Sequence, residues 1–243
     1  MPNILILGAT SDIAVAIASE FAQEKYNLSL AARNVESLQP IKKDVEIRHQ
    51  NRVELYSFDA VDFDSHLQFF QNLKEKPAVT VCVFGLMEEE NLAFENWQVC
   101  KSMIDTNFTG AVSILNIIAK YYIEQNSGTI VGVSSVAGER GRQSKLIYGS
   151  SKAAFSTYLA GLRNLSYNSN VQVLSVKPGF VYTKMTEELN LPAVLTATPE
   201  LVAKKIYRGV KNGKNTLYVK WFWRYIMIII KLIPEGVFKK LKI

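Results

Sequence analysis

The chain has 243 residues, enough for one substantial hydrophobic core, and its composition of 48% hydrophobic and 21% charged residues is that of an ordinary globular protein. No repeat of fixed period occurs, which excludes a solenoid or propeller. The net charge of +6 is concentrated at one end, since residues 211–243 hold eight Lys or Arg and one acid, whereas residues 1–210 sum to −1. A nucleic-acid binder would spread its basic residues over one face, so this pattern argues against nucleic acid and favours an anionic surface such as lipid headgroups.

Cysteine and histidine residues give no sign of a metal centre. Cys82 and Cys100 lie in apolar stretches without metal-ligand spacing, and the only histidines, His49 and His66, are isolated. We therefore expect free buried thiols, no disulfide framework and no metal. No secretory signal precedes the first strand-like run, which predicts a cytoplasmic protein.

Short apolar runs alternate with segments of helical periodicity along the chain. Strands are expected at Asn3–Leu7, Leu28–Ala31, Val53–Phe58, Val79–Phe84, Thr129–Val133, Val171–Val176 and Thr216–Val219. Helices are expected over Ala14–Phe21, Cys100–Glu124, Tyr148–Tyr167 and Pro199–Val210. This alternation predicts an α/β fold, a Rossmann-like, doubly wound parallel sheet of seven strands, in which residues 1–219 form the catalytic domain and residues 220–243 a helical tail. Ligands of such sheets bind beyond the carboxyl ends of the strands.

The loop after the first strand has the position of a dinucleotide-binding loop. Gly8 permits a tight turn, and Thr10, Ser11, Asp12 and Ile13 lead into the helix, whose N-terminus would offer free amides to a pyrophosphate. Asp12 and Ala14 replace two of the usual three glycines, and we expect the Asp12 side chain to cap the helix. By itself the loop is equally consistent with a plain strand–helix turn.

Two charged residues at the next strand ends bear on the cofactor. Arg33 follows the second strand, where NAD-binding proteins carry an acid for the ribose 2′-hydroxyl. An arginine there can pair with a 2′-phosphate, so NADP(H) is favoured, with NAD(H) as the alternative and a solvated loop charge as the simpler interpretation. Asp59, after the third strand, could accept a hydrogen bond from adenine or cap the next helix.

A proton-transfer set is indicated by Tyr148 and Lys152, which lie four residues apart on one predicted helix face. A neighbouring ammonium, helped by an oxidised nicotinamide, would lower the pKa of the phenol. The same spacing recurs at Tyr207 and Lys211, but only Tyr148 has a serine, Ser135, thirteen positions upstream at a strand end.

With these residues the chain resembles the short-chain dehydrogenase/reductase family over residues 3–219. The resemblance implies that Ser135 binds the carbonyl oxygen, Tyr148 transfers the proton, Lys152 tunes the phenol and binds the nicotinamide ribose, and Asn107 holds a water. It also implies cofactor contacts from the segments after strands three, four and six, namely Asp59, Ala60, Phe84, Gly85, Pro178, Gly179, Val181 and Thr183. Homo-oligomers are common in the family.

Within this family the chain is similar to one subgroup, the decaprenylphosphoryl-2-keto-erythro-pentose reductases. The shared segments are Gly85-Leu86, residues 134–142, residues 148–152 and the C-terminal stretch from Arg224 to Leu241, and the acid at Asp12 and the Phe84-Gly85 pair are features of the subgroup. This similarity implies a polyprenyl-phosphate 2-keto sugar as substrate and a separate flavin oxidase as the partner that supplies the ketone.

The tail from Lys220 to Ile243 is too short and too charged to span a bilayer. Lys220, Arg224 and Lys231 fall at helical spacing among aromatic and branched residues, which is typical of a helix lying in a membrane interface. The alternative is a segment packed over the substrate pocket or a subunit contact. Arg140 and Arg142, upstream of Tyr148, are either ligands of a lipid phosphate or solvated charges.

Three functions follow from these patterns. The first is a reductase of a lipid-linked keto sugar, peripheral to the inner face of the cytoplasmic membrane. The second is a soluble carbonyl reductase or dehydrogenase of a small or acyl-linked ketone. The third is a nicotinamide-binding protein without catalysis.

Overall fold

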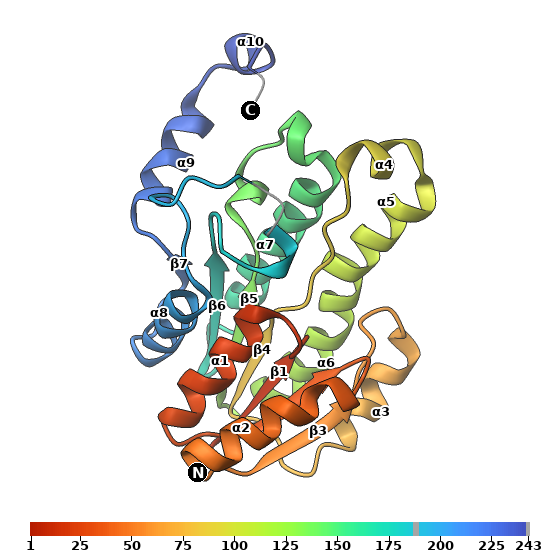
Figure 1. Cartoon of the computed structure of the whole chain (residues 1–243), viewed down its shortest axis with the longest axis vertical. Coiled ribbons are helices and arrows are strands. Elements are labelled where there is room, and N and C mark those ends of the chain that lie inside the picture. The colour runs from red at the N-terminus through yellow and green to blue at the C-terminus, as the bar shows by residue number, and fades with distance from the viewer. Residues whose placement is uncertain (187–189, 242–243) are drawn as a thin grey trace.

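One parallel sheet organises residues 1–186 and 190–241, the part of the chain that the computed structural model describes (Figure 1). Its seven strands lie in the order β3-β2-β1-β4-β5-β6-β7, and all neighbouring pairs are parallel. The strands are β1 (Asn3–Leu7), β2 (Asn27–Ala32), β3 (Val53–Ser57), β4 (Val79–Cys82), β5 (Gly128–Val133), β6 (Val171–Lys177) and β7 (Thr216–Tyr218). The predicted doubly wound sheet is confirmed, with the order reversing between β1 and β4.

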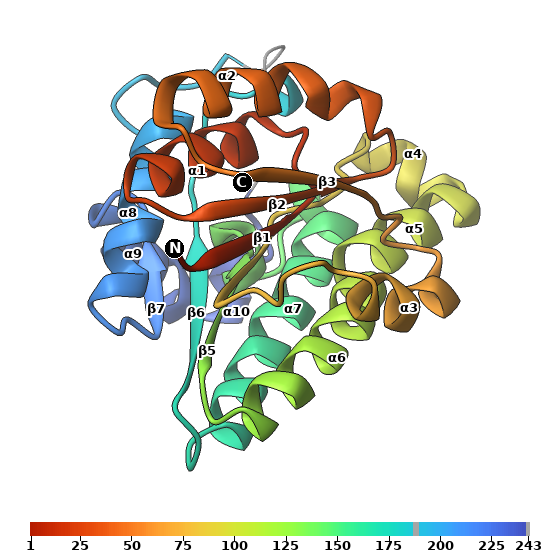
Figure 2. The ribbon, with the colours of Figure 1, turned by 90° about the horizontal axis from the view of Figure 1, so that it is seen from below.

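Helices cover both faces of this sheet (Figure 2). One layer contains α1 (Asp12–Gln23), α2 (Gln39–His49) and α8 (Pro199–Lys211), and the other contains α3 (His66–Gln71), α6 (Gly110–Glu124) and α7 (Leu146–Leu165). Strand β1 is buried on both sides because Ile4 and Ile6 join the first core and Leu5 and Leu7 the second.

The predicted helix Cys100–Glu124 is longer and interrupted. Helix α5 (Trp97–Ile104) begins three residues earlier because the Asn96 side chain accepts hydrogen bonds from the Gln98 and Val99 amides, at 2.9 and 3.4 Å. A π-helical turn (Asp105–Thr109) separates α5 from α6. At the start of α6, Gly110 permits a close approach, since a Cβ there would lie 2.0 Å from the Ala60 carbonyl oxygen. Such π turns are frequent at functional sites.

The other predicted elements agree with the structure to within two residues at most ends. Among the described residues, three short or weakly periodic α-helices were not expected, namely α2, α3 and α4 (Glu90–Glu95), whereas α10 (Glu235–Phe238) lies in the predicted helical tail. The alternation of apolar runs predicts strands better than short helices, whose few buried residues give little periodic signal.

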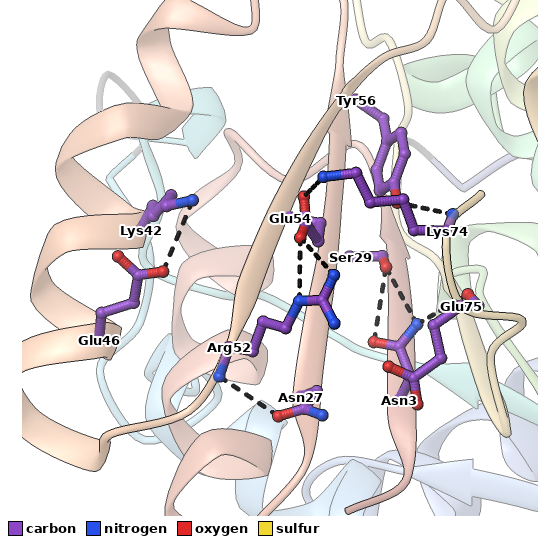
Figure 3. Close-up of polar contacts among 10 residues, drawn as sticks. All are labelled: Asn3, Asn27, Ser29, Lys42, Glu46, Arg52, Glu54, Tyr56, Lys74 and Glu75. Carbon is purple, nitrogen blue, oxygen red and sulfur yellow. Dashed lines mark hydrogen bonds and ion pairs between the residues drawn. The ribbon is translucent and has the colours of Figure 1, made fainter. Parts of the chain in front are cut away.

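The edge of the sheet at β3 carries charged and polar contacts away from the carboxyl ends (Figure 3). Glu54 accepts hydrogen bonds from Arg52 and Lys74, each at 2.8 Å. The side-chain amide of Asn3 donates one hydrogen bond to the Ser29 hydroxyl at 3.0 Å and another to the Glu75 backbone carbonyl at 3.1 Å. Charges on an edge strand discourage pairing with another sheet, so this edge is protected from aggregation.

The C-terminal tail is attached to the fold through helix α9 (Phe222–Leu232), which lies beyond the carboxyl ends of β6 and β7 (Figure 1). Trp223 and Met227 are buried with Val136. The Trp223 indole lies directly on Gly179, where a Cβ would be 2.1 Å from the ring. Among the described residues, no helix is both long and apolar enough to cross a membrane.

A buried carboxylate holds the tail to the strands. The Glu139 side chain, only 5% exposed, forms ion pairs with Lys177 and Lys231. It also accepts a hydrogen bond from the Tyr218 hydroxyl at 3.0 Å. Burial alone would raise the pKa of Glu139, but the hydrogen bonds and charges of the two lysines outweigh it and hold the pKa below its ordinary value.

This lowered pKa makes the attachment of the tail pH-dependent. The stabilisation by Glu139 is complete above the ordinary glutamate pKa of about 4.3 and is lost as the pH falls through the lower pKa of the folded state. We predict that Glu139→Gln costs about 1–3 kcal/mol at pH 7. In thermal unfolding the difference from the parent protein should shrink below about pH 4.

The matched control is Glu235→Gln. Glu235 pairs with Arg140, but its side chain is 77% exposed, so less than about 0.5 kcal/mol is expected at any pH. If the loss of stability of Glu139→Gln relative to the parent protein were the same at pH 7 and at acid pH, the ionised Glu139 carboxylate would not be what holds the tail.

Candidate active site

A cavity of about 510 Å³ opens at the carboxyl ends of the strands. It lies at the switch point between β1 and β4, where doubly wound sheets bind ligands. All residues predicted to contact the cofactor line it, and they are Gly8, Thr10, Ser11, Asp12, Ile13, Arg33, Asp59, Ala60, Phe84, Gly85, Tyr148, Lys152, Pro178, Gly179, Val181 and Thr183. The structure therefore brings together segments that are up to 175 positions apart in sequence.

The floor of the cavity at β1 requires glycine. Gly8 has φ +89°, and a Cβ on it would lie 2.7 Å from the backbone nitrogen of Phe84. Glycine alone adopts this conformation without strain. The approach of Phe84 to Gly8 explains why the two loops form one continuous surface.

The N-terminus of α1 opens onto this surface. Ser11 is its N-cap, and the Ser11 hydroxyl accepts a hydrogen bond from the Ala14 amide at 3.2 Å. The amides of Asp12 and Ile13 come before the first intrahelical hydrogen bond, so they and the helix dipole favour an anion. This cradle fits the pyrophosphate of a dinucleotide.

The prediction that Asp12 caps α1 is wrong. Ser11 has the extended backbone that an N-cap needs, so Asp12 is already the first residue of the helix. The Asp12 carboxylate instead accepts a hydrogen bond from the Lys184 amide at 2.7 Å. It thus ties the segment after β6 to α1 across the cavity.

Arg33 and Asp59 lie along the β2 and β3 side of the cavity. Arg33 is exposed at the end of β2, beside the buried Ala32. Asp59 accepts a hydrogen bond from the Val61 amide at 3.1 Å and so closes the turn in which it lies. It does not cap the next helix, which was one of the two interpretations of this residue. The His66 ring, fully buried, lies 2.9 Å from the Asp59 carbonyl and fixes this turn.

Helix α7 begins with a cap that the sequence does not reveal. The Glu90 carboxylate accepts hydrogen bonds from the Ile147 and Tyr148 amides at 2.8 and 3.2 Å. One turn later, the Ser151 hydroxyl donates to the Tyr148 carbonyl at 2.7 Å. Glu90 is 58 positions from Tyr148, so no local pattern could identify it.

Ser135 lies at the end of β5, facing the start of α7. Its hydroxyl accepts a hydrogen bond from the Ala137 amide at 3.1 Å. The turn packs closely on α7, since a Cβ on Gly138 would lie 2.6 Å from the Ala153 nitrogen. This close packing sets the Ser135 hydroxyl beside the Tyr148 phenol, whose pKa it lowers slightly.

The pKa of Tyr148 in the protein alone lies above its ordinary value. Burial raises it to about 12, and the Ser135 hydroxyl opposes this shift only in part. A lowered pKa was predicted for the phenol with the ammonium and an oxidised nicotinamide beside it, which stays a prediction for the cofactor-bound state. In the protein alone, the Lys152 Nζ lies 5.8 Å from the centre of the Tyr148 ring, and burial is the larger effect.

Lys152 is a buried ammonium with a single protein acceptor among the described residues. Its Nζ donates to the Val133 carbonyl at 3.3 Å. Burial lowers the pKa of Lys152 to about 8. The Nζ also faces Gly85, where a Cβ would lie 3.1 Å from it. The absence of a side chain at Gly85 keeps the space in front of the ammonium open.

Asn107 lies behind the cavity wall and does not line the cavity. From the π-helical turn, its side chain accepts a hydrogen bond from the Leu86 amide and donates to the Leu86 carbonyl, both at 2.8 Å, and it also donates to Ser151 at 3.0 Å. It therefore braces the Gly85-Leu86 segment against α7.

Met87 and Lys145, which no sequence pattern indicated, also line the cavity. Arg140 and Arg142 were expected to be either ligands of a lipid phosphate or solvated charges, and of the two only Arg142 lines the cavity. No group of three or more His, Cys, Asp or Glu in residues 1–186 and 190–241 is placed to hold a metal.

Comparisons with known proteins agree with this geometry. The family model for short chain dehydrogenase matches residues 2–193. An uncharacterized oxidoreductase of Mycobacterium tuberculosis is 30% identical over 98% of this chain and 96% of its own length. Another, from Streptomyces coelicolor, is 31% identical over 98% of this chain and 95% of its own length.

Solved structures show the same fold. A short-chain dehydrogenase from Sphingobium yanoikuyae in complex with NADPH superposes with a TM-score of 0.84 at 18% identity, and covers 99% of this chain and 96% of its own. On the family match and the full-length relatives, this chain belongs to the short-chain dehydrogenase family and is an oxidoreductase of that family.

Proposed function

We propose that the protein uses NADP(H) to reduce a ketone to a secondary alcohol. The observation that carries the proposal is one cavity with two ends. Ser135, Tyr148 and Lys152 line one end, and the glycine loop with the N-terminus of α1 forms the other. A single dinucleotide could therefore lie with its pyrophosphate at the N-terminus of α1 and its nicotinamide beside the Tyr148 phenol.

The choice of NADP(H) over NAD(H) rests on Arg33. Its exposed guanidinium borders the cavity at the end of β2, and the described residues place no acid beside Ala32 to bind a ribose 2′-hydroxyl. Solved relatives of the fold were obtained with NADPH or NADP, including a short-chain dehydrogenase from Burkholderia cenocepacia. The nicotinamide, when bound, supplies the hydride.

The side chains of the chain supply the proton and orient the carbonyl. Ser135 would donate a hydrogen bond to the carbonyl oxygen, and Tyr148, protonated because its pKa is raised, would donate the proton. Lys152 would exchange its Val133 contact for the ribose hydroxyls, and its charge would stabilise the phenolate that remains. Asn107, which does not line the cavity, would act indirectly by holding Leu86 and Ser151 in position.

For the substrate we propose a lipid-linked, polyprenyl-phosphate 2-keto sugar. The proposal rests on the segments shared with the keto-pentose reductase subgroup and on the basic, aromatic tail. A flavin oxidase would then supply the ketone, a homo-oligomer is expected, and the protein would work at the inner face of the cytoplasmic membrane.

The second candidate is a soluble carbonyl reductase of a small or acyl-linked ketone. It is favoured by Trp223 and Met227, whose burial gives the tail a packing role.

The first test of the proposal is Tyr148→Phe. Loss of the proton donor should lower kcat for ketone reduction about 10²–10⁴-fold. Binding of NADPH, measured by fluorescence titration, should stay near that of the parent. The control is Tyr207→Phe, which alters the other Tyr-x-x-x-Lys pair, outside the cavity, and should keep parental turnover. Equal turnover by Tyr148→Phe would refute proton transfer by this residue, and NADPH binding without turnover of any ketone would favour the non-catalytic function.

A second test concerns the cost of burying Lys152. Its pKa is about 8 in the folded state and about 10.4 when unfolded, so the unfolded state binds more protons between these values and stability rises with pH there. Burying the protonated lysine therefore destabilises the folded state by about 3 kcal/mol below pH 8, and this destabilisation has disappeared above pH 10.4. Without cofactor, Lys152→Met should therefore be inactive but about 1–3 kcal/mol more stable at pH 7.

This stability difference should narrow as the pH approaches 10, because the parent lysine becomes neutral. Thermal unfolding of both proteins at several pH values measures it. Lower stability of Lys152→Met at every pH would show that the ammonium holds the fold together, contrary to its proposed role.

A third test addresses the membrane. Trp221, directly before α9, is 73% exposed, and Ile229 within α9 is 64% exposed, both amid basic residues of the tail. The double variant Trp221→Ser, Ile229→Ser should bind phosphatidylglycerol vesicles about 10–100-fold more weakly in co-sedimentation. The reason is that it lacks the two apolar side chains that would be buried in the lipid interface. High salt should weaken binding of the parent.

The control for this test is Phe94→Ser, which removes an apolar side chain of similar exposure, 74%, from α4. It should leave vesicle binding unchanged. If the parent protein does not sediment with anionic vesicles, the tail serves packing and the soluble reductase is favoured.

A further inference from the structure

The loop between Ser135 and Tyr148 carries a buried donor without a partner. The Nε atom of Arg142 is buried and makes no hydrogen bond within residues 1–186 and 190–241. Burial also lowers the pKa of this guanidinium. Nearly all buried N–H groups in folded proteins are paired, and an exception at a cavity wall indicates a missing ligand group.

Arg140, two positions earlier, shows what a structural arginine in this loop looks like. Its guanidinium donates to the Ile233 carbonyl at 2.7 Å, pairs with Glu235 at 2.9 Å and stacks on Phe238 at 3.6 Å. It closes the C-terminal end of α9 and points away from the cavity. The terminal nitrogens of Arg140 are thus bound to the tail, whereas the buried Nε of Arg142 has no partner among the described residues.

A second cation stands beside Arg142. Lys145 lines the same cavity, and its ammonium contacts only the Met87 sulfur, at 3.4 Å, among the described residues. A thioether is a weak acceptor, so the charge is poorly satisfied. Glu90, at the start of α4, uses both carboxylate oxygens on the Ile147 and Tyr148 amides.

Among the described residues that line the cavity, the only acids are Asp12 and Asp59, both of which follow strands on the predicted cofactor side. Asp12 is bound by the Lys184 amide and Asp59 by the Val61 amide. Glu88 and Glu89 border a separate surface hollow that Lys145 also touches, but Arg142 does not line that hollow. Within residues 1–186 and 190–241, the two cations that line the cavity beside the Ser135–Tyr148 loop thus have no carboxylate partner.

We propose that Arg142 and Lys145 bind a negatively charged group, a phosphate or a carboxylate, of the substrate whose ketone lies at Ser135 and Tyr148. This inference rests on the proposed function. The planar fork of arginine binds two oxygens at once, and the partial burial of Arg142 strengthens the attraction. The anion would fix which carbonyl of the substrate reaches Tyr148.

The first measurement is thermal unfolding of the NADPH-loaded protein. Arg142→Gln removes a desolvated charge that no group in the described part of the chain compensates, so its Tm should equal or exceed that of the parent. Arg140→Gln removes several contacts to α9 and should lower the Tm. A fall in Tm for Arg142→Gln as large as that for Arg140→Gln would make Arg142 structural and overturn the proposal.

The second measurement is calorimetric titration of the NADPH-loaded protein with phenyl phosphate, benzoate and benzyl alcohol. Bound NADPH keeps the anions out of the cofactor cradle, and the three probes distinguish phosphate, carboxylate and neutral ligands. Arg142→Gln should weaken the preferred anion at least about tenfold, with Lys145→Gln adding to the loss, and leave benzyl alcohol unaffected.

Arg48→Gln, a surface substitution on α2 paired with Asp44, is the matched control and should bind like the parent. The proposal fails if the parent binds no anion at millimolar concentration, or if Arg142→Gln binds anions as well as the parent. Because the readout is binding, the inference can fail while ketone reduction stands. A protein that binds the anion but reduces no ketone would instead defeat only the proposed function.

Discussion

The site depends on one costly contact, the burial of the Lys152 ammonium with a single carbonyl acceptor from Val133. A buried ammonium lacks the solvation that water would give it, so the surrounding backbone must hold its position. The hydroxyl of Ser134 donates to the Lys152 carbonyl at 2.9 Å, and Asn107 braces the segment opposite it. The rest of the catalytic geometry follows from keeping this charge in place.

The tail is part of the same construction. Trp223 packs on Gly179, in the segment that borders the cofactor, and on Val136, directly after Ser135. The Val136 amide in turn donates to the Pro178 carbonyl at 3.0 Å. The C-terminal helix therefore buttresses the catalytic turn from outside while its opposite face remains exposed, so packing and surface contact are compatible roles for one helix.

In the loop after β5, the charged residues that are paired differ in role from those that are not. Glu139 and Arg140 have their charges paired and hold the tail, whereas Arg142 and Lys145 line the cavity and form no ion pair with any described residue. Proteins commonly accept a loss of stability where a ligand later compensates it. Four neighbouring charged residues thus divide into two pairs with different physical roles.

The sequence by itself determined the sheet, the cavity edge and many of the residues that line it, because apolar runs and glycine turns are local signals. It placed Ser135, Tyr148 and Lys152 on the correct elements. Only the tertiary structure decided that Glu90 caps α7, that Arg140 serves the tail, that Met87 and Lys145 line the cavity, and that burial raises the pKa of Tyr148. These features depend on which distant groups meet and how much water they exclude, and neither quantity is encoded in local spacing.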